Sequence, residues 1–161
     1  MAQEIELKFL VKGAFKPFVT KKMEIQQAYL STQPNRTVRI RIKDGKGYIN
    51  IKGAARISGI MRFEWEQEIP LKDAKDLMEL RESGIVKKTR YIVPAGNSLE
   101  FEVDEFHGDN KELLLAEIEL PSADMIFEKP EWLGQEVTGN PAFYSAELSK
   151  NPYCNWKELA S

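Results

Sequence analysis

The chain has 161 residues, of which 25 are Asp or Glu and 23 are Lys or Arg, so its formal net charge is only −2. A balance this close to neutral excludes a strongly basic nucleic-acid protein and gives no sign of an acidic tail. Charged residues make up 30% of the chain, above the usual share of about 25%, so the positions of the charges are the informative feature.

The composition predicts one domain over residues 1–161, large enough to bury a core. Cys154 is the single cysteine, which excludes a disulfide within the chain and favours a reducing compartment. The first residues, MAQEIELKF, lack the apolar segment of a signal peptide, and no apolar run approaches the ~20 residues of a membrane helix. We therefore expect a cytoplasmic protein without a membrane partner.

Alternation of apolar and polar residues is the dominant pattern of the chain. It predicts strands near residues 2–11, 24–32, 36–43, 47–53, 60–69, 86–93, 99–106 and 113–120. Short turn signals separate several of these strands, and Asp44-Gly45 is the strongest, which favours antiparallel neighbours. The predicted fold class is α+β, with antiparallel strands in a single sheet or, where the sheet closes, in a β-barrel of about eight strands, and with a few flanking helices.

Helical segments are few. Apolar spacing predicts a helix over residues 71–82, which would cover one side of the sheet. Ser122 is a candidate N-cap for a short helix over residues 123–128. Asn140 and Asn151 each precede a proline and predict the starts of two C-terminal helices.

Each predicted strand has a charged face, and the signs are sorted by strand. Bases dominate the strands at 36–43, 47–53 and 86–93, whereas acids dominate those at 2–11, 60–69, 99–106 and 113–120. Two interpretations stay open. The charges could all face water, as on one side of many antiparallel sheets. Alternatively, they line the interior of the barrel, which the sorting favours because a solvated face usually mixes its signs.

A charged interior has a chemical purpose. Carboxylates bind hard cations, and Mg²⁺ usually joins one or two of them to substrate phosphates. Arginines at alternate positions, as in RIRIK, are suited to a bidentate grip on phosphate oxygens. The second interpretation therefore predicts a phosphate substrate that carries divalent cations.

The segment EIELKF at residues 4–9 resembles the ExExK signature of the CYTH domains, also called triphosphate tunnel metalloenzymes. The resemblance continues through most of the chain, in the order expected for short bacterial members. The further matching segments are QQAYL, VRIRI, INIKG, RFEWEQEI, KKTRY, FEVDEFHG, LAEIEL and GQEVTGNPAFY. The resemblance implies an eight-stranded triphosphate tunnel with a C-terminal plug helix. It also implies metal-dependent hydrolysis of inorganic tripolyphosphate or a related organic triphosphate.

Roles for individual residues follow from the resemblance. Lys8 and Tyr29 are the expected catalytic residues. The expected phosphate-binding bases are Arg39, Arg41, Lys52, Lys88 and Arg90. The expected ligands of Mg²⁺ or Mn²⁺ are Glu4, Glu6, Glu64, Glu66, Asp104, Glu117 and Glu119. Ala28 and Ser145 depart from the glycine and asparagine that are common at their positions, and neither change removes a charged ligand.

Other functions stay open at this level. Class IV adenylate cyclases and thiamine triphosphatases share the fold, so the fold does not select the substrate. A non-catalytic barrel could instead bind polyphosphate or nucleic acid, although such a groove would be basic without an acidic counterpart. The charged set offers few aromatic side chains for stacking a base or a thiazolium ring, which favours tripolyphosphate as the small-molecule substrate. A monomer and a homodimer are both compatible with the pattern.

Overall fold

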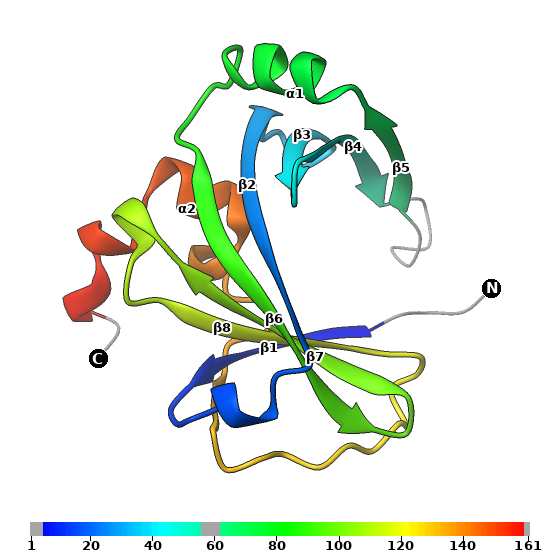
Figure 1. Cartoon of the computed structure of the whole chain (residues 1–161), viewed down its shortest axis with the longest axis vertical. Helices are drawn as coiled ribbons and strands as arrows, with labels where there is room; N and C mark the ends of the chain where they lie inside the picture. The colour runs from blue at the N-terminus through cyan, green and yellow to red at the C-terminus, as the bar shows by residue number, and fades with distance from the viewer. Residues whose placement is uncertain (1–4, 56–61, 160–161) are drawn as a thin grey trace.

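The structure is a computed structural model that describes residues 5–55 and 62–159 of the chain. Its main feature is a curved antiparallel sheet (Figure 1). Within the described residues the sheet has nine strands, in the hydrogen-bonded order β5-β4-β3-β2-β6-β7-β8-β1-β9. The long strands β2 and β6 join the two halves of the sheet: β3, β4 and β5 lie on one side of them, and β7, β8 and β1 on the other (Figure 1).

The strands span Ile5–Val11 (β1), Lys21–Ser31 (β2), Arg36–Lys43 (β3), Lys46–Ala55 (β4), Arg62–Ile69 (β5), Val86–Gly96 (β6), Leu99–Phe106 (β7), Leu114–Leu120 (β8) and Leu133–Glu136 (β9). The α-helices span Leu71–Met78 (α1) and Ser145–Lys150 (α2). Single 3₁₀ turns lie at Lys16–Phe18, Gly108–Asn110, Pro141–Phe143, Tyr153–Asn155 and Lys157–Leu159. No helix within residues 5–55 and 62–159 is both long enough and apolar enough to cross a membrane.

The predicted strands are present, but the expected count of eight is one too low. The additional strand, β9, pairs with Phe9 and Val11 of β1, and its four residues, LGQE, are too short to show an alternating pattern. In the described part of the chain, β5 and β9 are the two edges of the sheet and no pairing joins them. The sequence predicted a barrel of about eight strands, and the described residues form a curved sheet of nine.

The helix predictions have mixed outcomes. The helix expected over residues 71–82 forms as α1 but ends at Met78. The helix expected after Ser122 does not form, and that prediction is wrong. Phe127 instead packs edge-on against Phe9 and Phe101, with ring centroids 6.2 and 5.9 Å apart, so tertiary packing holds this segment in an irregular path across the sheet.

The C-terminal segment follows β1 and then turns toward β2 and β6. The N–H of Val137 donates to the carbonyl of Lys8 at 2.8 Å. The Asn140 side chain caps the next turn, as predicted, by accepting a hydrogen bond from the N–H of Ala142. Asn151, by contrast, precedes only 3₁₀ turns. Helix α2 lies beside β2 and β6 (Figure 1). The hydroxyl of Ser149 on this helix is 2.7 Å from that of Ser83, in the loop before β6.

The strand register gives the sheet one charged face. Directly opposed residues on antiparallel strands point to the same side. Glu6 is opposite Glu119, Arg90 is opposite Asp104, and Lys52 is opposite Glu64. The charged face, as we use the term, consists of Glu6, Lys8, Gln27, Tyr29, Arg39, Arg41, Asn50, Lys52, Glu64, Glu66, Lys88, Arg90, Glu102, Asp104, Glu117 and Glu119.

The other face of the sheet is largely apolar, and much of it is covered, although Phe63 and Trp65 of β5 are exposed on it. One core cluster, which includes Phe9, Phe101 and Trp132, lies under the segment that connects β8 to β9. A second cluster joins Ile40 to Ala74 and so packs α1 against β2, β3 and β4. The covered parts of this face form the core, and the acids and bases predicted for the site lie on the opposite, charged face.

Helix α1 sits very close to β4, which yields a test of the fold. A Cβ added at Gly47 would lie 2.6 Å from the Cβ of Ala74, too close unless α1 moves away. We predict that Gly47→Ala lowers the free energy of unfolding by ~1–3 kcal/mol, the usual cost of overpacking, as measured by urea denaturation. Lys46→Ala, at the exposed neighbouring position, should leave it unchanged. Equal stability of Gly47→Ala and the unmodified protein would contradict this packing.

Candidate active site

Carboxylates gather on the charged face where β1 pairs with β8. Glu6 lies opposite Glu119, and Glu117 lies opposite Lys8. The pKa of Glu6 is raised to about 7, first by desolvation and then by repulsion from Glu117, against an opposing effect of Lys8. Repulsion from Glu117 does not require full burial, so it acts on Glu6 although the residue as a whole is exposed.

This group of acids fits a hard divalent cation. Oxygen atoms are the ligands that Mg²⁺ prefers, and a cation between Glu6 and Glu117 would remove their repulsion. Among the described residues, no three His, Cys, Asp or Glu side chains already form a metal-binding group. Glu4, a predicted ligand, lies outside the described residues. Mg²⁺ usually joins one or two carboxylates to substrate phosphates, and Glu6 and Glu117 fit that arrangement.

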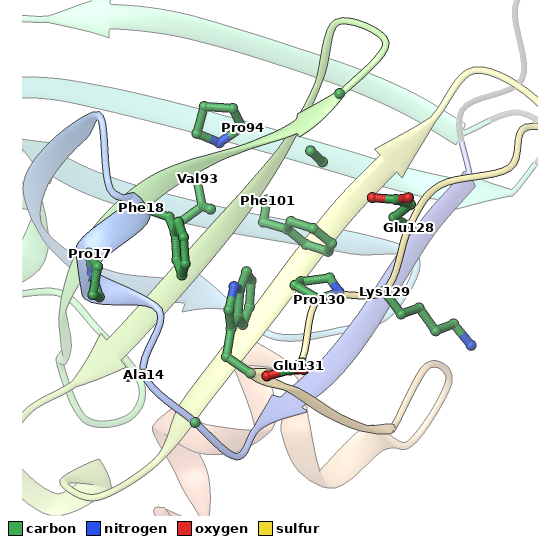
Figure 2. A pocket seen from close by; sticks show the side chains of 14 residues that line it. Ala14, Pro17, Phe18, Val93, Pro94, Phe101, Glu128, Lys129, Pro130 and Glu131 are labelled. Atoms are coloured by element: carbon green, nitrogen blue, oxygen red, sulfur yellow. The ribbon is translucent and has the colours of Figure 1, made fainter.

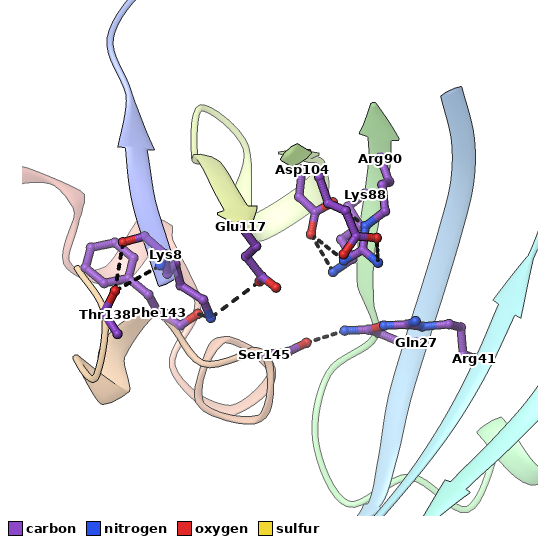
Figure 3. Close-up of polar contacts among 11 residues, drawn as sticks. Lys8, Gln27, Arg41, Lys88, Arg90, Asp104, Glu117, Thr138, Phe143 and Ser145 are labelled. Atoms are coloured by element: carbon purple, nitrogen blue, oxygen red, sulfur yellow. Dashed lines mark hydrogen bonds and ion pairs between the residues drawn. The ribbon is translucent and has the colours of Figure 1, made fainter. Parts of the chain in front are cut away.

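Asp104 lies at the centre of a buried ion-pair network (Figure 3). Its Oδ2 accepts from Nζ of Lys88 at 2.7 Å, and its two oxygens accept from Nε and Nη2 of Arg90 at 2.8 and 3.0 Å. Arg90 also donates to Glu102 at 3.0 Å. Because Lys88 and Arg90 engage both of its oxygens, Asp104 has the geometry of a residue that positions these two basic side chains. Its role as a metal ligand stays a prediction.

The charge states of this network follow from burial and pairing. Burial alone would raise the pKa of Asp104, but Lys88 and Arg90 outweigh it and hold that pKa well below its usual range. Burial likewise opposes the charge on Arg90, yet Asp104 holds the pKa of Arg90 above its usual value. For Lys88, burial dominates the attraction of Asp104 and lowers the pKa to about 8. Lys88 is thus a buried cation that a further anion would stabilise.

Arg39 and Arg41 stand side by side on β3, two residues apart. Burial, followed by the nearby charges of Arg39 and Arg90, lowers the pKa of Arg41 to about 10. Arg41 donates from Nε and Nη2 to Oε1 of Gln27. Nε of Arg39 is buried and has no hydrogen-bond partner among the residues that the structure describes. The two guanidinium groups therefore concentrate positive charge with little local compensation.

The two predicted catalytic residues come from strands that are not neighbours in the sheet. Nζ of Lys8 lies 3.6 Å from Oε1 of Glu117 and donates to the carbonyl of Phe143 at 3.3 Å (Figure 3). Tyr29 is only 6% exposed and lies opposite Arg39, on the basic side of the face. Lys8 is thus tied to the acids and Tyr29 to the bases.

The remaining predicted residues lie on β4 and β5. Nζ of Lys52 is 3.8 Å from Oε1 of Glu64, and the Asn50 amide donates to Oε2 of Glu66 at 3.3 Å. Glu64 and Glu66 are exposed on an edge strand. In the hydrogen-bonded order five strands lie between β5 and β8, and the role of these two acids as metal ligands stays a prediction.

An open pocket of about 1160 Å³ lies away from these residues (Figure 2). Its lining includes Phe18, Val93, Phe101 and Pro130, which belong to the apolar side of the sheet or to loops beside it. Lys129 is the one base among its lining residues. A triphosphate needs several cations, so this pocket is a poor candidate for the site.

Some residues of the site were not predicted from the sequence. Gln27 is fully buried between Arg41 and Ser145, and the Phe143 carbonyl contacts Lys8. The alternation of β2 carried one signal, since Gln27 is two residues from Tyr29 and must share its face. The Phe143 contact uses a main-chain oxygen, for which the sequence has no signal.

The family model of the CYTH domain matches residues 2–152. The chain belongs to the CYTH domain family. An inorganic triphosphatase from Acetivibrio thermocellus is 42% identical to the chain over 159 residues, which cover 98% of the chain and 100% of that protein. An inorganic triphosphatase from Nitrosomonas europaea is 32% identical over 150 residues, covering 91% of the chain and 96% of that protein.

This CYTH domain also resembles solved structures. The crystal structure of the inorganic triphosphatase NE1496 matches it with a TM-score of 0.70 at 28% identity, covering 92% of this chain and 95% of that one. The match confirms an antiparallel tunnel-like β fold with flanking helices. Membership of the CYTH family implies dependence on a divalent metal, which the carboxylates of Glu6 and Glu117 fit.

The Asp104 network gives a test of the site. Asp104→Asn keeps the side-chain shape but leaves the buried charge of Lys88 without its carboxylate and leaves Arg90 with Glu102 alone. We predict a loss of ~3 kcal/mol in the free energy of unfolding, measured in urea, as for other broken buried ion pairs. Glu105→Gln is the matched control, because Glu105 pairs with Lys16 in a more exposed place. A loss in Asp104→Asn no larger than in this control would contradict the network.

Proposed function

We propose that this CYTH domain hydrolyses inorganic tripolyphosphate to pyrophosphate and phosphate on its charged face. The two relatives that are 42% and 32% identical to it are both inorganic triphosphatases, and each matches nearly the whole chain. Phosphoryl transfer depends mainly on positioning and on neutralising charge. A face with bases on some strands and acids on others can do both for a phosphate chain that carries cations.

The observation that carries this proposal is the unsatisfied donor of Arg39. Its Nε is buried without a hydrogen-bond partner in the described part of the chain, a costly state for a charged group. Arg39 lies opposite Tyr29 and Asn50 on the charged face. Phosphate oxygens accept strong charge-assisted hydrogen bonds from guanidinium groups. A bound triphosphate would therefore satisfy Arg39.

The other bases extend this grip. Lys88 donates to Asp104 and has three N–H groups, so two remain for phosphate oxygens. Arg41 is aimed by Gln27, and Arg90 by Asp104, so neither has to be ordered when substrate binds. We also assign Lys52 to binding the phosphate groups of the substrate.

We assign Lys8 and Tyr29 to the reacting phosphate. The ammonium group of Lys8, fixed beside Glu117 and the Phe143 carbonyl, would stabilise negative charge that develops there. The hydroxyl of Tyr29, on a buried ring, would orient a phosphate oxygen or the attacking water. Glu6, Glu117 and Glu119, with Glu4, would hold Mg²⁺ or Mn²⁺, which supplies charge neutralisation on the phosphates when bound.

The proposed setting is a cytoplasmic enzyme with a small-molecule substrate and no nucleic-acid or membrane partner. The acids on the charged face support the absence of a nucleic-acid partner, because they would repel its phosphate backbone. Neither a monomer nor a homodimer conflicts with the proposed site.

A substrate comparison tests the proposal. Purified protein is incubated with tripolyphosphate, ATP or thiamine triphosphate in Mg²⁺ or Mn²⁺, and both free phosphate and cyclic AMP are measured. We predict phosphate release that is fastest from tripolyphosphate and abolished by EDTA. Cyclic AMP from ATP without phosphate from tripolyphosphate would favour a cyclase. Binding of tripolyphosphate that survives EDTA, without turnover, would favour a non-catalytic barrel.

Arg39 offers a sharper test. Arg39→Ala should weaken tripolyphosphate binding by ~1.5–3 kcal/mol, the value of a hydrogen bond to a charged group, which corresponds to about a 10- to 150-fold higher KM. Arg39→Lys should recover only part of the loss, because lysine lacks the planar fork. Arg81→Ala changes an exposed arginine three residues after the end of α1 and serves as the control. An unchanged KM in Arg39→Ala would show that Arg39 does not contact substrate.

The metal assignment is tested separately. Glu119→Gln should raise the Mn²⁺ concentration needed for half-maximal activity and weaken Mn²⁺ binding seen by electron paramagnetic resonance. The fold should stay intact, because Glu119 is exposed and the change removes a charge from a group of acids. Glu105→Gln, in which the acid stands outside the charged face, should bind Mn²⁺ like the unmodified protein. If both variants behave alike, Glu119 is not a ligand.

A further inference from the structure

Gln27 is an uncharged side chain on the charged face, and it is 0% exposed. Its Oε1 accepts hydrogen bonds from Nε and Nη2 of Arg41 at 3.0 and 2.8 Å. Its Nε2 donates to Oγ of Ser145, the first residue of α2 (Figure 3). A single amide therefore connects β2, on which it stands, to β3 and to the C-terminal helix.

The contact between Gln27 and Arg41 differs in charge from the contact that holds the neighbouring base, Arg90. Arg90 is paired with Asp104, which offsets its charge. Gln27 satisfies two donors of Arg41 but carries no charge, so the positive charge of Arg41 is left for another anion. Two donors that meet one oxygen also fix the plane of the guanidinium group. Arg41 is thus aimed without being neutralised.

The segment that supplies Ser145 also touches the acidic side of the face. The carbonyl of Phe143 accepts from Nζ of Lys8, and the ring of Tyr144 lies 5.5 Å from the same ammonium group. Three consecutive residues, Phe143 to Ser145, therefore contact Lys8 on one side and, through Gln27, reach Arg41 on the other. The start of the C-terminal helix therefore connects an expected catalytic residue to an expected phosphate-binding base.

We propose that Gln27 is a positioning residue: Ser145 fixes its amide, and the amide in turn orients Arg41, so that the start of α2 sets the direction of a phosphate-binding base. The inference rests on the proposed function, since it takes Arg41 to bind substrate phosphates. Gln27 itself does not touch the substrate. It acts through Arg41 and is not a catalytic residue.

Kinetics of Gln27→Met test this role, because methionine fills the same space without accepting the hydrogen bonds. The expected result is a KM for tripolyphosphate raised about 10-fold, the size of one lost charged hydrogen bond, with kcat changed much less. Ser145→Ala removes only the link to α2 and should raise KM in the same direction by about 3-fold, as for a neutral hydrogen bond. Ser83→Ala is the matched control: it loosens α2 at Ser149, away from Arg41, and should leave KM unchanged.

A double-mutant cycle separates positioning from general damage. Tripolyphosphate affinity is measured by calorimetry in the Arg41→Ala background. If Gln27 acts through Arg41, then adding Gln27→Met there should cause no further loss, and adding Ser145→Ala should cause none either. Additive losses would overturn the proposal, and so would an unchanged KM in Gln27→Met. Should Gln27→Met fail to fold, the Ser145→Ala cycle decides by the same criterion.

An NMR measurement makes failure of this inference distinguishable from failure of the proposed function. In ¹⁵N-arginine-labelled protein without substrate, the Nε–H of Arg41 should exchange slowly with water, and Gln27→Met should make that exchange fast. Fast exchange in the unmodified protein would overturn the contact itself, whatever the enzyme does. Absence of tripolyphosphate hydrolysis in a protein with slow exchange would overturn the proposed function and with it the role of Arg41 toward substrate.

Discussion

The buried contact of Asp104 with Lys88 and Arg90 is the interaction on which the charged face depends. Taking cations out of water is costly, and Arg41, Lys88 and Arg90 repel one another across the strands that carry them. One ionised carboxylate, 2% exposed in its side chain, offsets much of that cost and fixes two of the bases in place. The offset is incomplete, and the excess positive charge is what a phosphate chain can neutralise.

The rest of the fold keeps this face apart from the apolar core. Strand alternation sends every second side chain to the opposite side, where α1 and the segment between β8 and β9 cover much of it. The C-terminal segment then crosses from β1 to β2 and contacts Lys8 and Gln27. In Figure 1, α2 accordingly lies beside β2 and β6, the strands that join the two halves of the sheet.

Period-two alternation and the sorting of charge by strand were enough to predict which residues share a face, as for Arg39 and Arg41. They could not predict which strands are neighbours, so the pairing of Asp104 with Lys88 and Arg90 emerged only from the register. Gln27 has no charge to mark it, and its role depends on a helix that is 118 residues away in sequence. Strand β9 is too short for a periodic signal, and Phe127 packs on the sheet where local spacing favoured a helix. The likeness of EIELKF and the later segments to CYTH domains supplied what the charge pattern left open, namely the substrate class.

The central claim is that tripolyphosphate lies on the charged face, with its oxygens on the bases and its cations on the acids. Crystals grown with tripolyphosphate and Mn²⁺, measured at the manganese absorption edge, test it most directly. The account predicts an anomalous peak beside Glu6, Glu117 and Glu119, and a phosphate oxygen within hydrogen-bond distance of the Arg39 Nε. A substrate bound in the apolar pocket beside Phe18 and Phe101, or manganese bound away from the carboxylates of β1 and β8, would contradict it.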